Sequence, residues 1–129
     1  MKKGRVAIGM ALAAALLLTG CATEQEKRQR AKIHMDMAAV QIQAGNYTAG
    51  LKELMEAEKQ TPEDPKVHYL LAYAYGGKGL NDDALREAKK AVELKPDYSE
   101  AHNYLGTLYL NMGQYDRAID SFNRALGNP

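Results

Sequence analysis

The chain contains very little of several residue types, and each scarcity excludes a class of structure. It has one cysteine, Cys21, so no intramolecular disulfide can form, and it has no tryptophan and a single phenylalanine among its 129 residues. Alanine, leucine, lysine, glutamate and glutamine recur instead, which suits packed helices better than sheets. The length leaves room for one small domain. We therefore expect an all-α fold without disulfide support.

An excess of charge of one sign is also lacking. The formal net charge is +1, from 17 basic and 16 acidic residues, and three of the basic residues, Lys2, Lys3 and Arg5, lie within the first five positions. The rest of the chain carries 14 basic and 16 acidic side chains, a net charge of about −2. A nucleic-acid-binding domain needs a basic face. We therefore expect no nucleic acid among the partners.

The apolar run near the N-terminus is short. Val6 to Leu18 is a stretch of 13 residues without a charged or polar side chain, whereas a helix that crosses a bilayer needs roughly 20. A permanent anchor helix is therefore the weaker interpretation. A cationic start, an apolar run and then small residues are the layout of a secretory signal peptide, which we assign to residues 1–20.

The last residues of this leader give the single cysteine a role. Leu18-Thr19-Gly20-Cys21 resembles the lipobox of bacterial lipoproteins, in which a thiol forms a thioether to a diacylglyceryl group. The resemblance implies cleavage before Cys21, a covalent diacylglyceryl group and an N-acyl chain such as palmitate on that residue, and no other cofactor. Ala22 stands where an aspartate favours the inner membrane, so we expect the outer membrane, facing the periplasm. An ordinary secreted protein with an incidental cysteine is the alternative. Residues 21–30 are then the lipidated N-terminus and a polar spacer.

A period of 34 residues runs through the remaining sequence, and it predicts the domain organisation. It is most visible in the three histidines, because His34, His68 and His102 are each 34 residues from the next. The same step relates Gly45, Gly79 and Gly113; Ala57, Ala91 and Ala125; Ala38, Ala72 and Gly106; Met37, Leu71 and Leu105; and Pro62 and Pro96. We assign the copies to residues 31–64, 65–98 and 99–129.

Within each copy, two helical stripes flank a glycine that can adopt the left-handed backbone of a helix end. The period and the sparse pattern resemble the tetratricopeptide repeat, most clearly in the third copy, through Leu105-Gly106, Tyr109, Gly113, Tyr115, Ala118, Phe122 and Ala125. The resemblance implies an all-α, right-handed α-solenoid of three helical hairpins with a concave inner surface. No polar closing helix follows the third copy. We therefore expect its apolar face to be uncovered, and either a chain truncated at its C-terminus or a partner that covers this end.

The concave surface is the predicted binding site, formed by one stripe on the first helix of each hairpin. The positions that face it in this family are Lys32, Met35, Ala39, Ile42, Lys66, Tyr69, Tyr73, Glu100, Asn103, Thr107, Leu110 and Asn111. Tyr69 and Tyr73 have the apolar body and polar tip of interface hot spots, although both rings could instead pack against the adjacent helix. Repeats that clamp a terminal carboxylate carry asparagines where this chain has Ala39 and Leu70, so we do not expect a C-terminal carboxylate as ligand.

Catalytic and metal-binding motifs are not recognisable in the sequence. Equivalent positions on stacked helices lie about 8–10 Å or more apart, whereas zinc ligands must lie about 2.0–2.3 Å from one ion. The three histidines are therefore expected to be structural. Ser99 and Ser121 lack a Gly-x-Ser-x-Gly setting, and there is no phosphate loop or His-Glu-x-x-His motif. We expect no enzyme activity, no metal and no small-molecule substrate.

The leader, the spacer and the repeats together resemble the type IV pilus biogenesis lipoproteins that act as pilotins for the outer-membrane secretin. The stretches most like that family are Tyr104-Leu105-Gly106 and residues 125–129, although its members carry more repeats than this chain. The resemblance implies a membrane-anchored scaffold that binds secretin subunits and assists their localisation and assembly. An adaptor that recruits peptidoglycan hydrolases is the second interpretation, and an enzyme is the third.

Overall fold

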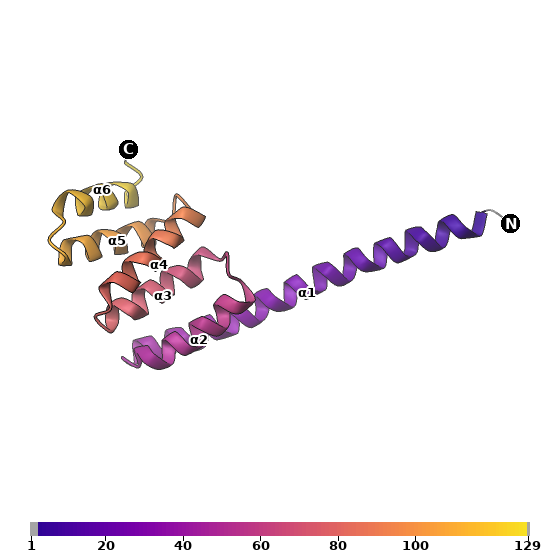
Figure 1. Ribbon diagram of the computed structural model, residues 1–129, viewed down its shortest axis with the longest axis horizontal. Helices are drawn as coiled ribbons and strands as arrows, with labels where there is room; N and C mark the ends of the chain where they lie inside the picture. Colours follow the sequence, from indigo (N-terminus) through magenta and orange to yellow (C-terminus); the bar gives the residue numbers. More distant parts are fainter. Residues whose placement is uncertain (1–2, 129) are drawn as a thin grey trace.

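The computed structural model describes residues 3–128, with side chains for residues 23–128. In this part of the chain it contains six α-helices and no strand (Figure 1). The helices are α1 (Lys3–Gln43), α2 (Tyr47–Gln60), α3 (Pro65–Gly77), α4 (Asn81–Leu94), α5 (Ser99–Asn111) and α6 (Tyr115–Ala125). They pair as the hairpins α1–α2, α3–α4 and α5–α6, which stack in chain order. The predicted all-α fold of three helical hairpins is confirmed.

The turn inside each hairpin depends on a glycine with a left-handed backbone. Gly45, Gly79 and Gly113 have φ angles of 78°, 76° and 72°, a region that costs a residue with a Cβ atom considerably more than it costs glycine. In the third hairpin, the backbone N–H of Gln114 then donates to the carbonyl of Tyr109 at 2.8 Å, which closes the helix end. The 34-residue spacing of these glycines therefore reflects a backbone requirement.

Close approach of the paired helices depends on small residues. A Cβ atom added at Gly106 would lie 2.5 Å from Cε1 of Phe122, and one added at Gly50 would lie 2.8 Å from Cγ1 of Ile42. Ala72, the register equivalent of Gly106 in the second hairpin, is fully buried. Larger side chains at these positions would push the two helices of a hairpin apart.

The connections between hairpins contain prolines and one side-chain cap. Pro62 and Pro96 follow the ends of α2 and α4. A proline inside either helix would remove a backbone hydrogen bond, so neither helix can continue through these positions unchanged. The carboxylate of Asp64 accepts a hydrogen bond from the backbone N–H of Lys66 at 2.8 Å, and Pro65 occupies the first position of α3. This arrangement satisfies a free N–H group and presets the helical φ angle.

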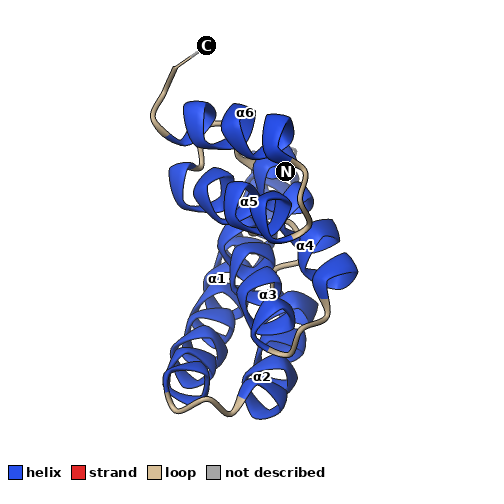
Figure 2. Ribbon diagram, turned by 90° about the vertical axis from the view of Figure 1, so that its left-hand side faces the viewer, coloured by secondary structure: helices blue, strands red, loops and turns tan. Residues whose placement is uncertain are grey.

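The first helices of the hairpins form the inner layer of the stack. α3 contacts both α1 and α5, whereas α2, α4 and α6 make no comparable contact with one another within the described residues. Figure 2 shows α1, α3 and α5 following one another along the stack. The predicted stripe of binding residues therefore lies on the helices that line one common surface.

Both ends of the stack expose apolar side chains. Met37 on α1 is 48% exposed, whereas its register equivalents Leu71 and Leu105 are 2% and 4% exposed because each packs against a preceding hairpin. At the other end, Tyr115 and Ile119 of α6 are 65% and 59% exposed. Within the part of the chain that the structure describes, the apolar face of the last hairpin is thus uncovered, as expected.

Helix α1 continues beyond the first hairpin through the predicted leader and spacer (Figure 1). The spacer from Thr23 to Arg30 is helical, and its side chains are exposed. The predicted lipid attachment at Cys21 lies outside the described side chains. Among the residues that the structure describes, no helix has both the length and the apolar character needed to span a membrane.

Candidate functional site

Four tyrosines gather on the inner surface where α3 meets α5. Tyr69 and Tyr73 lie one turn apart on α3, Tyr104 lies on α5, and Tyr98 directly precedes α5. The Tyr69 ring centroid lies 5.4 Å from that of Tyr98 and 6.4 Å from that of Tyr104, while the Tyr73 and Tyr104 centroids are 5.3 Å apart. These distances are typical of favourable aromatic pairs. We call these four residues the tyrosine cluster.

The tyrosine cluster combines packed rings with accessible surface. Tyr73 is 44% exposed, and the other three rings are half-buried. Burial raises the pKa of Tyr98 and of Tyr104 to about 12 and raises that of Tyr69 as well. The four rings therefore offer a partner apolar faces, and the hydroxyl groups with raised pKa remain protonated hydrogen-bonding groups at neutral pH.

A glycine makes room for the central ring of the cluster. Gly76 lies on α3, and a Cβ atom there would collide with the hydroxyl group of Tyr104. The absence of a side chain on Gly76 therefore lets the hydroxyl end of Tyr104 reach the backbone of α3. This contact links the shape of the inner surface to the packing between the second and third hairpins.

Charged and polar side chains border the tyrosine cluster. Nζ of Lys95 lies 5.0 Å from the ring centroid of Tyr98, within range of a cation–π interaction. Lys66 and Asn103 are exposed, and the hydroxyl group of Thr107 donates to the carbonyl of Asn103 at 3.2 Å. An apolar centre with a polar border is the usual anatomy of a protein-binding surface.

Most of the predicted groove residues are accessible. Lys32, Lys66, Asn103 and Leu110 are exposed, Thr107 and Ala39 are partly buried, and Glu100 and Asn111 are exposed. Tyr69 and Tyr73 pack against the tyrosines of the next hairpin, and both rings still keep accessible surface. Their role in binding stays a prediction.

Met35 and Ile42 are corrections to the predicted groove. Each is only 8% exposed, and both belong to the apolar core formed by α1, α2 and α3. Ile42 fills the space left by Gly50, which has no side chain on the facing helix. Met35 has a flexible unbranched side chain that can turn into the core. Neither residue offers a surface to a partner.

Tyr98 and Tyr104 belong to the tyrosine cluster but not to the predicted stripe of binding residues. Tyr104 is 34 residues after Leu70, a position that the predicted stripe left out, and Tyr98 lies just outside the helix that carried the stripe. A comparison of aromatic residues in every column of the 34-residue register could have found Tyr104. Tyr98 required the three-dimensional course of the loop.

The histidines form a second set of contacts that sequence reasoning did not predict. Nδ1 of His34 lies 2.8 Å from Glu53, and Nδ1 of His68 lies 2.9 Å from Glu87, in both cases with a spacing of 19 residues. At the corresponding position after His102, the chain has Ser121. The repeated spacing was the signal in the sequence, since it places the partner on the second helix of the same hairpin.

His68 is buried and polarised by its neighbours. The hydrogen bond to Glu87 raises the pKa of His68, and the same bond lowers the pKa of Glu87. The second ring nitrogen, Nε2, donates to the carbonyl of Pro62 at 2.7 Å. In the third hairpin, Nε2 of His102 donates in the same way to Pro96 at 2.7 Å. Both histidines therefore hold the loop before their own helix.

Comparison with known proteins agrees with this architecture. Residues 69–129 match the model of the tetratricopeptide repeat family. The fold is a tetratricopeptide-repeat solenoid. Among solved structures, the second tetratricopeptide domain of Spaghetti, bound to an HSP90 peptide, is similar with a TM-score of 0.75 and 21% identity, over 82% of this chain and 97% of that one. The tetratricopeptide domain of Arabidopsis OM64 has a TM-score of 0.75 at 16% identity, over 78% and 84% of the two chains.

Curated relatives share tetratricopeptide-repeat sequence over a small part of their length. Hsp70-Hsp90 organizing protein 1 of Glycine max is 30% identical over 80 residues, which cover 62% of this chain and 14% of the relative. DnaJ homolog subfamily C member 3 of Homo sapiens is 28% identical over 97 residues, which cover 74% of this chain and 19% of the relative. The chain thus spans less than a fifth of these two relatives. The shared part is the tetratricopeptide-repeat region.

Proposed function

We propose that this chain is a lipid-anchored scaffold that binds a protein partner on the inner surface of its tetratricopeptide solenoid. The observation that carries the proposal is the tyrosine cluster, which places four rings at the junction of α3 and α5 and leaves Tyr73 44% exposed. Tyrosine is enriched among the residues that dominate binding energy at interfaces. The similar Spaghetti domain was solved with a bound HSP90 peptide, which supports a peptide segment as the ligand.

The chemistry of the surface narrows the kind of segment that fits. The exposed face of Tyr73 suits an apolar or aromatic side chain, and Lys66 and Lys95 at the border suit acidic groups. Ala39 and Leu70 cannot form the asparagine pair of a carboxylate clamp. We therefore infer an internal segment of the partner, with a bulky side chain near an acidic one.

The binding proposal is tested by Tyr73→Ala in the full chain. Truncation of this exposed ring should weaken partner binding by at least about tenfold, the scale of a hot spot, and leave the helix content unchanged. Tyr115→Ala is the matched control, because Tyr115 is 65% exposed and lies on α6, away from the tyrosine cluster. Equal capture of the partner by both variants and the parent would refute the inner-surface assignment.

The lipid anchor is tested separately at Cys21. We expect Cys21→Ser to leave the helical fold intact and to release the protein from the membrane fraction, because the thioether and the acyl chains can no longer form. Cell fractionation and circular dichroism measure the two effects. Unchanged membrane retention would contradict the lipoprotein proposal without affecting the binding surface.

The finer proposal is that the partner is a secretin and that the chain acts as a pilotin. Its support is the resemblance of the leader, the spacer and the third repeat to type IV pilus biogenesis lipoproteins, together with a surface suited to a protein segment. Secretin subunits would be bound at the inner surface and assisted to the outer membrane. A tetratricopeptide lipoprotein adaptor that recruits peptidoglycan hydrolases remains the second candidate, and neither role requires catalysis by this chain.

A direct comparison distinguishes these two partners. The full-length gene product is used to capture proteins from solubilised membranes, and purified secretin and peptidoglycan hydrolases from the same cells are then tested one by one. Binding of secretin that falls with Tyr73→Ala, but not with Tyr115→Ala, supports the pilotin role. Recovery of a wall enzyme without secretin or other pilus proteins would reject that role in favour of the adaptor.

A further inference from the structure

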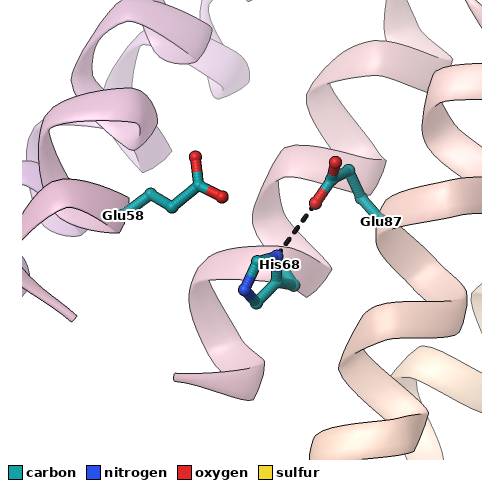
Figure 3. Close-up of side chains that lie close together, drawn as sticks. All are labelled: Glu58, His68 and Glu87. Carbon is teal, nitrogen blue, oxygen red and sulfur yellow. Dashed lines mark hydrogen bonds and ion pairs between the residues drawn. The ribbon is translucent and has the colours of Figure 1, made fainter. Parts of the chain in front are cut away.

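Three possible metal ligands from three helices meet at the junction between the first and second hairpins. Glu58 comes from α2, His68 from α3 and Glu87 from α4, and their ligand atoms all lie within 4.8 Å of one another. Figure 3 shows the carboxylates of Glu58 and Glu87 extending toward the imidazole of His68 from opposite sides. The side chains of His68 and Glu87 are only 5% and 13% exposed. We call these three residues the junction cluster.

The hydrogen bonds of His68 determine which ring nitrogen faces the carboxylates. The carbonyl of Pro62 can only accept, so the Nε2 atom 2.7 Å away must carry a hydrogen. In the neutral ring, Nδ1 is then an unprotonated acceptor that faces Oε2 of Glu87 at 2.9 Å. Two acceptors at this distance need a cation between them, either a proton or a metal ion. The backbone bond at Nε2 is also the usual outer support of a metal-binding histidine.

The charges around His68 favour a divalent ion. Glu58 forms no hydrogen bond or ion pair within the described residues, so its carboxylate is available to an ion. Arg86 contacts the other oxygen of Glu87, with Nε 3.2 Å from Oε1, which leaves Oε2 directed at His68. Two carboxylates and a neutral imidazole carry a net charge of −2, which a divalent cation balances and a single proton does not. The positive charge of Arg86 weakens the attraction of the two carboxylates for a cation, but this side chain is largely exposed to solvent.

We propose that Glu58, His68 and Glu87 bind a divalent transition-metal ion of the Zn²⁺ class. One imidazole nitrogen and two carboxylate oxygens are a donor set that Zn²⁺ accepts, and three protein ligands leave a fourth position for water. The ion replaces the proton shared by His68 and Glu87 and recruits Glu58 from the neighbouring hairpin. It thereby connects α2 to α3 and α4, and stiffens the junction that sets the curvature of the inner surface.

The third hairpin contains a natural control for this site. His102 repeats the bond of its Nε2 atom to a proline carbonyl at 2.7 Å. The residues 34 positions after Glu58 and Glu87 are Val92 and Ser121, and neither is a carboxylate. The hydroxyl group of Ser121 donates to the carbonyl of Arg117 instead. His68 therefore has both carboxylates beside it, whereas His102, at the equivalent position of the third hairpin, has neither.

Calorimetric titration of Zn²⁺ into the full chain tests the proposal, with Cys21→Ser in every sample because a thiol also binds zinc. We expect one equivalent of Zn²⁺ per chain and a metal-dependent rise in Tm. Glu58→Gln and Glu87→Gln should each lower the affinity for Zn²⁺ by at least about tenfold. Loss of a residue that only supports a ligand already lowers metal affinity by this factor, so loss of a ligand should do at least as much. Glu58→Gln keeps the test valid if Glu87→Gln unfolds the chain, because Glu58 makes no hydrogen bond with any residue that the structure describes.

The controls separate this site from adventitious binding. Glu53→Gln removes the partner of His34 and should leave Zn²⁺ affinity unchanged. Absence of binding to the parent chain, equal affinity of the parent and Glu58→Gln, or loss of binding only in Glu53→Gln would each overturn the proposal. Conversely, Val92→Glu combined with Ser121→Glu should create a second equivalent at His102. A folded double variant without that second equivalent would show that the three side chains do not suffice.

Discussion

At the scale of single residues, the inner surface depends on where side chains are missing. Gly76 admits the hydroxyl end of Tyr104, and Gly50 admits Ile42. The first absence helps to form the tyrosine cluster, whereas the second removes a predicted binding residue from the surface. A family pattern indicates on which face of a helix a residue lies. The size of the residue opposite it decides whether its side chain stays accessible.

Gly76→Ala tests whether Tyr104 needs the space above Gly76. The substitution should lower stability in the parent chain but not in a chain that lacks the Tyr104 hydroxyl group. In the parent chain, the added methyl group collides with the Tyr104 hydroxyl and should lower the free energy of unfolding by about 1–3 kcal/mol, the usual cost of overpacking. In a Tyr104→Phe background, the colliding oxygen is absent. The helix propensity of alanine should then make the same substitution neutral or stabilising by up to about 1 kcal/mol.

Urea denaturation of the four members of this double-mutant cycle measures the coupling between the two sites. Additive effects, with an equal cost of Gly76→Ala in both backgrounds, would show that Tyr104 does not occupy the space above Gly76 in solution. The tyrosine cluster would then need a different arrangement.

The tyrosine cluster also predicts a dependence of stability on alkaline pH. Burial is the main reason that the pKa of Tyr98 and of Tyr104 is raised from 10.0 to about 12, and Glu100 contributes to the shift at Tyr98. The unfolded chain therefore loses these protons first. The resulting stabilisation is fully present below pH 10 and is lost as the pH rises through 12.

Thermal unfolding of the full chain between about pH 9 and pH 12 measures this loss. A variant with both Tyr98→Phe and Tyr104→Phe should show a smaller decrease of Tm over that range than the parent. The Tm of Tyr115→Phe, which changes an exposed position on α6, should decrease over that pH range as much as the Tm of the parent. Identical pH profiles for all three chains would contradict the burial of the two rings.

At the scale of helices, the same register position has different roles in different hairpins. Leu51, Leu85 and Ile119 are related by 34 residues, but Leu51 is 8% exposed and Ile119 is 59% exposed. The difference arises because α3 packs against α2, whereas no helix among the described residues packs against the outer face of α6. The amphipathic pattern is repeated, and only the presence of a neighbour makes its apolar side part of the core.

Alanine substitutions at Leu51 and Ile119 should have different effects on stability, because only Leu51 is packed against a neighbouring hairpin. Leu51→Ala removes buried methyl groups and should cost about 2–5 kcal/mol of unfolding free energy. Ile119→Ala removes methyl groups that are mostly exposed, and should change stability by no more than about 0.5 kcal/mol. Chemical denaturation of the isolated chain gives both values. Similar losses at the two positions would indicate that the face of α6 is covered in solution.

At the scale of the whole molecule, much of the fold was predictable from the spacing of a few residues. The glycines at 45, 79 and 113 require left-handed turns, and small residues at matching positions allow close helix pairs, so three hairpins follow from local chemistry. The site was only partly predictable. Tyr69 and Tyr73 belonged to the expected stripe, but Tyr98 and Tyr104 came from a loop and from a column outside it.

The sequence by itself determined the repeat unit, because backbone geometry and apolar periodicity act within one hairpin. It also carries the lipobox-like leader on which the proposed tether rests. Only the tertiary structure decided which side chains meet across hairpins: Met35 entered the core, four tyrosines assembled on the inner surface, and Glu58 reached His68 and Glu87. Such contacts depend on how successive hairpins stack, and a 34-residue period records the similarity of the units and not the angle between them.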